Sequence, residues 1–323
     1  MTKIFDCFLY NGEDNLLEIR LNNLEKYVDF FVIVESCQTF QGKIKKFRFN
    51  KKNFFIKKLI KKIIYLQNDI VAENIYELKK KIAQRYPDLT KKLNSIKNFY
   101  KKDFVWCLDS FHREIINEAI KDKIKKNDII MLSDIDEIPL YKILSKKIFN
   151  KNVVNVLVQN EFRYFYNTFV LNDWKGTIIT NWALAKKYGL NNLRHLGKKK
   201  CKDFKYISPG GYHFSSMGPK KNILRKIKEW GHKEFNNFIV KFFMITRYNK
   251  GLDIFFFKKN QFKIVQSINS NLFDEKMSSL IEKQNSLIRK TPFKKKNLLD
   301  DSIFYLIKFF LLFFKIKRRI ISN

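Results

Sequence analysis

The chain has 323 residues, a length that suits one large domain or two moderate ones. Hydrophobic residues make up 45% of it, enough for a sizeable core, which excludes an intrinsically disordered chain. Lysine and arginine total 65 against 31 acidic residues, so the formal net charge is +34. An excess of this size favours polyanionic partners such as nucleic acid, anionic lipid or phosphorylated substrates.

Cysteine spacing and the N-terminal sequence indicate the compartment. The four cysteines, at positions 7, 37, 107 and 201, lie far apart and show no paired spacing of the zinc-site kind. Cys7 and Cys107 fall in apolar or strand-like runs, which predicts reduced core thiols and a reducing compartment. The sequence opens on a strand-like run without the apolar segment and cleavage site of a signal peptide. We therefore expect a cytoplasmic protein.

The first half alternates short apolar runs with amphipathic segments. Strands are predicted over residues 3–10, 29–35, 62–66 and 128–134, and helices over residues 13–24, 71–98 and 109–126. This alternation is typical of an α/β domain with a mostly parallel sheet, in which ligands bind beyond the carboxyl ends of the strands. The residues at those ends therefore matter most: Tyr10, Glu35 and Ser133 to Glu137.

The second half has a less regular pattern. Strands are predicted over residues 153–158 and 162–170, a turn over 174–176, a flexible loop over 208–211 and a helix over 219–230. We expect one main domain over residues 1–250 and a helical C-terminal extension over residues 251–323.

The C-terminal tail combines an apolar run, residues 303–314, with a cluster of basic residues at 315–319. A membrane-spanning helix needs about 20 apolar residues, and this run is shorter and interrupted by Lys308. Residues 303–323 are therefore predicted to form an interfacial helix on an anionic membrane surface, at the inner face of the cell membrane. The alternative is a C-terminal helix docked on the protein core.

The strongest local signal is an acidic turn, residues 133–139, which follows a buried strand. It contains Asp134, Asp136 and Glu137, and burying such carboxylates without a counter-charge is costly. A hard divalent cation prefers oxygen ligands and would bridge Asp136 to a diphosphate. The alternative is a helix N-terminus, with Pro139 in the first turn and the carboxylates as favourable dipole charges.

Around this turn the sequence resembles glycosyltransferase family 17, the family of the enzyme that adds bisecting N-acetylglucosamine to N-glycans. Five groups of segments carry the resemblance in order: residues 6–10 with 16–21, 28–36 with 39–43, 133–139, 210–215 and 232–236. Three features differ from the family. Tyr212 replaces the usual tryptophan, we expect no N-terminal membrane anchor like that of the Golgi members, and the resemblance does not extend beyond about residue 250.

The resemblance implies a GT-A-like, Rossmann-type nucleotide-sugar-binding fold. It further implies a UDP-sugar donor, with UDP-N-acetylglucosamine the first expectation, Mn²⁺ or Mg²⁺ as the cofactor, and inversion to a β linkage. In a cytoplasmic setting the expected acceptor is a glycan or a lipid-linked glycan precursor.

Roles follow for particular residues, each with an ordinary alternative. We expect Asp134, Asp136 and His213 to hold the metal, and Asp6, Glu35, Arg113 and Asp134 to bind the donor. The alternatives are a turn cap for Asp6, an ion pair with the acidic turn for Arg113, and a backbone partner for His213. Inverting transfer also needs a base, and the sequence does not choose among Glu161, Asp173 and Glu234. Three aromatic residues could stack on sugar rings or belong to the core: Trp174, Trp182 and Tyr212.

Two other function classes remain open. The net charge also suits a nucleic-acid-binding protein, but no zinc-finger or RNP-type signature is present, so no specific nucleic-acid partner is expected. A membrane-tethered scaffold with a decayed active site is the other possibility. Retention of all three acidic-turn carboxylates argues against the scaffold.

Overall fold

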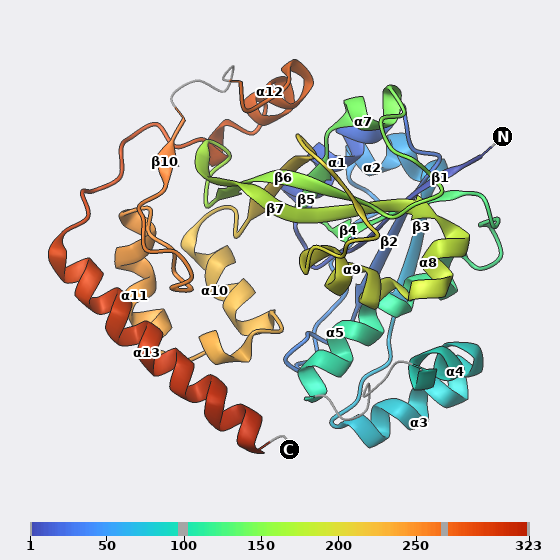
Figure 1. The fold of residues 1–323 in the computed structure, drawn as a ribbon, viewed down its shortest axis with the longest axis horizontal. Helices are drawn as coiled ribbons and strands as arrows, with labels where there is room; N and C mark the ends of the chain where they lie inside the picture. The colour runs from blue at the N-terminus through green and yellow to red at the C-terminus, as the bar shows by residue number, and fades with distance from the viewer. Residues whose placement is uncertain (1, 96–102, 266–270, 322–323) are drawn as a thin grey trace.

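A mixed β-sheet runs through the middle of the molecule, with helices on both of its faces (Figure 1). The computed structural model describes residues 2–95, 103–265 and 271–321. Besides the helices on its two faces, a third group of helices lies beside one end of the sheet and includes the C-terminal helix (Figure 1).

The first half of the chain forms the parallel part of the sheet. Its strands are β1 (Ile4–Leu9), β2 (Phe30–Ser36), β3 (Ile63–Asn68) and β4 (Ile129–Asp134), and they pair in the order β3-β2-β1-β4. The apolar runs of β1, β2 and β4 are buried on both faces, which is why they lack the alternation of a half-exposed strand. All four predicted strands of this half are confirmed.

The second half adds antiparallel pairings, so the prediction of a mostly parallel sheet holds only in part. The sheet continues from β4 through β7 (Thr168–Asn181), β6 (Asn155–Arg163), β9 (Gly211–Ser215) and β5 (Glu137–Pro139). The β4–β7, β6–β7 and β5–β9 pairs are antiparallel, whereas β6–β9 is parallel. Two short strands pair off this path, β8 (Lys205–Ile207) with β6 and β10 (Lys263–Ile264) with β7.

Helices cover the two faces of the sheet and form two cores. One face carries α1 (Asp14–Leu24), α2 (Phe54–Leu59), α7 (Tyr141–Ser145) and α12 (Glu275–Glu282). The other carries α3 (Ile75–Arg85), α4 (Pro87–Ser95), α5 (Phe104–Glu114), α6 (Ile116–Ile120), α8 (Trp182–Tyr188) and α9 (Leu190–Lys198). The helix predicted over residues 13–24 is confirmed as α1, whose side chains Leu16, Leu17, Leu21 and Leu24 are buried.

A third core joins α10 (Lys220–Glu229), α11 (Phe238–Asn249) and α13 (Leu298–Ile321). It draws side chains from both sides of position 250, among them Met244, Phe256 and Phe304. Phe304 and Ile307 of α13 are each only 3% exposed, whereas Leu306 and Phe309 on its other side are 70% and 73% exposed. No helix in the described part of the chain is long and apolar enough to cross a membrane.

Some predicted boundaries are wrong. The helix predicted over residues 71–98 is two helices, because Pro87 starts a new one after Tyr86; residues 96–98 lie outside the described part. The helix predicted from residue 109 begins at Phe104, where the side chain of Asp103 caps it, and α6 ends at Ile120.

The turn predicted over residues 174–176 is also wrong, because these residues lie within β7. Trp174 pairs with Gln159 and Lys175 with Val158 of the neighbouring strand. Gly176 lets the side chain of Gln159 pack closely at this point, since a Cβ there would lie 1.7 Å from the side-chain oxygen of Gln159.

Candidate active site

A cavity of about 830 Å³ opens where the carboxyl ends of β1, β2 and β4 meet. The strand register places Leu9 beside both Val34 and Asp134, so the segments that follow these strands converge. Ligands bind at this edge in sheets of this kind. The wall includes residues of the β1–α1 turn, the end of β2, α5, the acidic turn, β9 and α10: Tyr10, Glu13, Ser36, His112, Arg113, Asp136, His213, Arg225 and Lys226.

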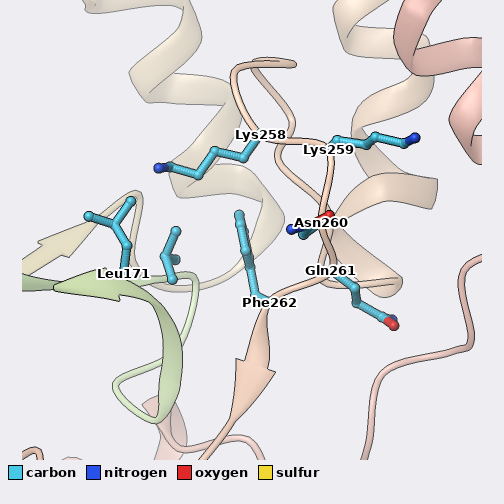
Figure 2. Close-up of a pocket in the computed structure, with 7 residues that line it drawn as sticks. Leu171, Lys258, Lys259, Asn260, Gln261 and Phe262 are labelled. Atoms are coloured by element: carbon cyan, nitrogen blue, oxygen red, sulfur yellow. The ribbon is translucent and has the colours of Figure 1, made fainter. Parts of the chain in front are cut away.

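A smaller cavity of about 330 Å³ lies between the first part of β7 and the segment before β10 (Figure 2). Its wall consists of Val170, Leu171 and residues 258–262. This wall contains no carboxylate and no histidine, and its charged groups are the ammonium groups of Lys258 and Lys259, so it offers no anionic or imidazole ligand for a metal ion. The candidate active site is therefore the larger cavity.

A buried arginine holds the backbone of the acidic turn. Arg20 of α1 is fully buried and donates to the carbonyl oxygens of Asp134 at 3.1 Å and Glu137 at 2.9 Å. Its ion-pair partner is Asp6 of β1, at 2.6 Å, with neither side chain exposed. Asp6 was predicted to contact the donor, but it does not reach the cavity. Its carboxylate instead orients the guanidinium that shapes the turn.

Two more arginines engage the carboxylate of Asp134. Arg113 of α5 lies 3.0 Å from one of its oxygens, and Arg194 of α9 lies 3.1 Å from the other. Burial alone would raise the pKa of Asp134, but the charges of Arg194 and Arg113 outweigh it and hold that pKa well below its usual range. The ion pair foreseen as the alternative for Arg113 is thus present. Asp134, predicted to bind metal and donor, has both oxygens engaged by protein groups.

Glu137 belongs to the same network and is fully buried. It accepts from Arg194 at 2.6 Å, from the indole nitrogen of Trp174 at 2.9 Å and from the backbone nitrogen of Asp134 at 3.1 Å. These three donors fix the side chain inside the protein. Glu137 therefore stabilises the turn and is not directed at a ligand.

Asp136 is the turn carboxylate that faces histidine and lysine. Strand β9 pairs with β5, and this brings Nε2 of His213 to 3.6 Å from Oδ2 of Asp136. Nζ of Lys226 lies 3.4 Å from the same oxygen. Burial would raise the pKa of Asp136, but Lys226 and His213 lower it to about 2. The ring of Trp174 stacks on His213 at 4.0 Å and fixes its plane.

Asp136 and His213 are the residues of this cavity whose chemistry suits a divalent cation. In the described part of the chain, no three His, Cys, Asp or Glu side chains converge as a preformed metal cage. Asp136 and His213 supply one oxygen and one nitrogen. Mg²⁺ commonly binds through one or two carboxylates, with phosphate and water completing its coordination, and Mn²⁺ accepts similar ligands.

Glu35 is buried away from the cavity. Its carboxylate accepts from Nζ of Lys45 at 2.9 Å, from the backbone nitrogen of Arg48 at 2.7 Å and from the hydroxyl of Tyr65 at 2.9 Å. These contacts fix the chain after β2. Lys45 and Ser36 line the cavity in place of Glu35, which was predicted to bind the donor.

The three base candidates have different surroundings. Glu161 is buried 2.7 Å from Arg163. Burial would raise its pKa, but the charge of Arg163 lowers it. Asp173 is 63% exposed and pairs with Lys175. Glu234 lies outside the cavity wall and bonds to His232, which is part of that wall.

Sequence reasoning missed Glu13, Arg194 and Lys226. Glu13 lines the cavity, accepts from the backbone nitrogen of Asn11 at 2.8 Å, and has a pKa raised by burial. Its place just after a predicted strand was an available signal. Arg194 and Lys226 lie on helices far along the chain, and only the folding of those helices onto the sheet brings them to the acidic turn.

Comparison with known proteins identifies a family. No curated protein matches the chain. The family model described as Glycosyltransferase family 17 matches residues 1–233, most of the chain. The matched part contains the acidic turn, the β9 histidine and the cavity-facing helix α10. On this match, the chain belongs to glycosyltransferase family 17.

Proposed function

We propose that this protein transfers a sugar from a UDP-sugar to a glycan or lipid-linked glycan, with inversion to a β linkage. UDP-N-acetylglucosamine is the donor we expect, and Mn²⁺ or Mg²⁺ the cofactor. The observation that carries the proposal is the convergence of Asp136, His213 and Lys226 on one cavity, inside the part of the chain that matches the family.

The cavity suits a nucleoside diphosphate in a GT-A-like arrangement. We place the diphosphate beside Asp136 and His213, where Lys226 and Arg225 supply positive charge. We place the nucleoside toward the end of β2 and α5, where Ser36 and His112 line the wall. When bound, the divalent cation neutralises charge that develops on the departing diphosphate.

The test is a thermal-shift titration with a panel of UDP-sugars, in Mn²⁺ or in EDTA. Binding to the folded state raises the melting temperature by mass action. We expect one UDP-sugar to give a rise that EDTA abolishes. If no nucleotide sugar raises the melting temperature of a folded sample, the proposed function is refuted.

We also propose that residues 303–323 attach the protein to an anionic membrane surface. One side of α13 packs on the third core through Phe304 and Ile307, while its other side leaves Tyr305, Leu306 and Phe309 more than half exposed. An exposed apolar stripe next to basic residues suits the interfacial region of a bilayer. A lipid-linked acceptor would then lie on the same surface.

A further inference from the structure

We propose that His232 is the catalytic base and that Glu234 is its positioning residue. The inference rests on the transferase activity proposed above. Nδ1 of His232 lies 2.7 Å from a carboxylate oxygen of Glu234. An ionised carboxylate only accepts hydrogen bonds, so Nδ1 donates to Glu234, and in the neutral ring this leaves the lone pair on Nε2. A base oriented by a third group through its other nitrogen is the arrangement that proton transfer requires.

Only the histidine of this pair lines the cavity. His232 is part of the cavity wall, whereas Glu234 lies behind it in the short 3-10 helix Lys233–Phe235. Two aromatic neighbours fix the imidazole: the Trp230 ring lies 4.2 Å away, and Trp106 approaches edge-on at 5.1 Å. Ring packing and the Glu234 bond together hold the histidine in one orientation.

Two side chains, Lys226 and Trp230, connect Asp136 at the diphosphate position to His232. Nζ of Lys226 is 3.4 Å from Asp136 and also 5.8 Å from the centre of the Trp230 ring. Trp230 in turn contacts His232. The cavity therefore has the groups that face the leaving diphosphate at one end of this row, and the imidazole at the other.

The remaining candidates are poorer bases. Arg163 neutralises Glu161 and lowers its pKa, and Asp173 is outside the cavity wall. Glu13 lines the cavity, but the charges that act on it are those of Arg225, Asp136 and Lys226. It thus lies among the groups assigned to the diphosphate, and inversion requires attack from the face opposite the leaving group.

The proposed step balances without any further reactant. The acceptor hydroxyl gives its proton to Nε2 of His232 as its oxygen forms a bond to the anomeric carbon of the donor sugar. The bond from that carbon to the diphosphate oxygen breaks, and UDP leaves with the electron pair. The imidazolium, stabilised by Glu234, then releases its proton to solvent.

The experiment uses full-length protein, Mn²⁺ and the UDP-sugar that gives the largest thermal shift, with water as acceptor and UDP release as the readout. We expect His232→Ala to lower turnover by about 10²–10⁴-fold, the range of general-base catalysis, while the UDP-induced thermal shift remains. Added imidazole should restore part of the turnover. His232→Gln, which keeps a polar side chain against the tryptophans, covers the case in which the alanine variant does not fold.

Glu234 is tested separately. Glu234→Ala should lower turnover with little change in the KM for the UDP-sugar. Glu234→Gln should retain more of the turnover, because its amide oxygen still accepts from Nδ1 of His232. Lys233→Ala is the matched control, since that residue lies between the two and pairs with Asp103 on the surface; its turnover should stay at the wild-type value.

Three results would overturn the assignment: wild-type turnover in His232→Ala, no response of that variant to imidazole, or loss of UDP binding in both His232 variants. The last would make His232 a donor contact. A wild-type protein that shows no thermal shift with UDP is a different failure, because it contradicts the proposed function itself.

Discussion

Among the carboxylates of the acidic turn, Asp136 is the one we assign to the metal, because it lines the cavity and its charged neighbours leave it available to a ligand. It faces His213 and Lys226, and among the residues that the structure describes no arginine forms an ion pair with it. We expect Asp136→Asn to reduce UDP release at least about 10²-fold, as removal of a preorganised electrostatic group does. The melting temperature should change by only a few degrees. Full activity in this variant would refute its assignment as a metal ligand.

Glu137, the next residue in the chain, should contribute mainly to stability, in contrast to the catalytic role of Asp136. It is fully buried and holds Arg194 at 2.6 Å. Removing one partner of a buried ion pair typically costs about 3–5 kcal/mol. We expect Glu137→Gln to lower the free energy of unfolding by about 3 kcal/mol in urea titrations. Glu118→Gln, whose pair with Lys121 is on the surface, is the control; equal losses in both variants would argue against the buried network.

The buried imidazole of His112 should make the free energy of unfolding depend on pH. Burial lowers its pKa from 6.5 to about 3, so the folded protein keeps the ring neutral. As pH falls below about 6.5, the unfolded chain binds a proton that the folded state does not, and stability drops by at most about 1.4 kcal/mol per pH unit. Between pH 7.5 and 5.0, wild type should therefore lose about 2 kcal/mol more than His112→Gln. Urea titrations at both pH values measure this difference, and equal losses would contradict it.

The sequence could point to Asp136 and His213 but not to the groups that complete the site. Both candidates lie in recognisable local patterns, a carboxylate turn after a strand and a histidine after two glycines. Arg194 and Lys226 lie among many basic residues on helices, and only tertiary packing distinguishes them. Asp6 and Glu35 were predicted at the cavity because they belong to strands that end there, but their side chains point to buried cations and backbone groups.

Among the elements, the buried parallel strands were the most predictable. Their apolar runs are short, rich in β-branched and aromatic residues, and separated by helices of clear periodicity. Strand β7 was not predictable in the same way. Its middle contains Asn172, Asp173, Lys175 and Gly176, which are typical of turns, and only pairing with β6 makes that stretch extended.

One side of helix α13 packs on the third core and the other side is exposed, so membrane attachment can be tested by changing the exposed side alone. Deleting residues 303–323 would also remove Phe304 and Ile307 from the third core. The better variant is Leu306→Glu with Phe309→Glu, at positions that are 70% and 73% exposed. We expect it to lower co-sedimentation with vesicles of anionic lipid at least several-fold while leaving the melting temperature unchanged.

Two controls complete that test. Phe54→Glu changes an 86% exposed phenylalanine on α2, and its vesicle binding should match wild type. Neutral phosphatidylcholine vesicles should bind wild type more weakly, because the basic residues then have no anionic partner. Unchanged binding of the double variant to anionic vesicles would refute the role of α13.

At the scale of the whole molecule, the cavity joins the sheet to the third group of helices. Asp136 belongs to the turn between β4 and β5, whereas Lys226 belongs to α10, which packs with α11 and α13. Without a ligand, the Lys226 ammonium lies close to the carboxylate that would bind a cation. A diphosphate changes this balance, because it gives Lys226 a second anionic partner and gives the cation additional oxygen ligands.

Cation and UDP binding should therefore be coupled, and thermodynamic linkage makes the coupling reciprocal. We expect UDP to tighten Mn²⁺ binding at least about 10-fold, a typical size for such coupling, and Mn²⁺ to tighten UDP binding by the same factor. Lys226→Met should bind Mn²⁺ more tightly than wild type when UDP is absent, since the competing charge is gone, and bind UDP more weakly. Electron paramagnetic resonance of free Mn²⁺, recorded with and without UDP, measures both effects. Equal Mn²⁺ affinity in the two proteins would mean that Lys226 does not compete for Asp136, and the diphosphate position would then have to be sought elsewhere in the cavity.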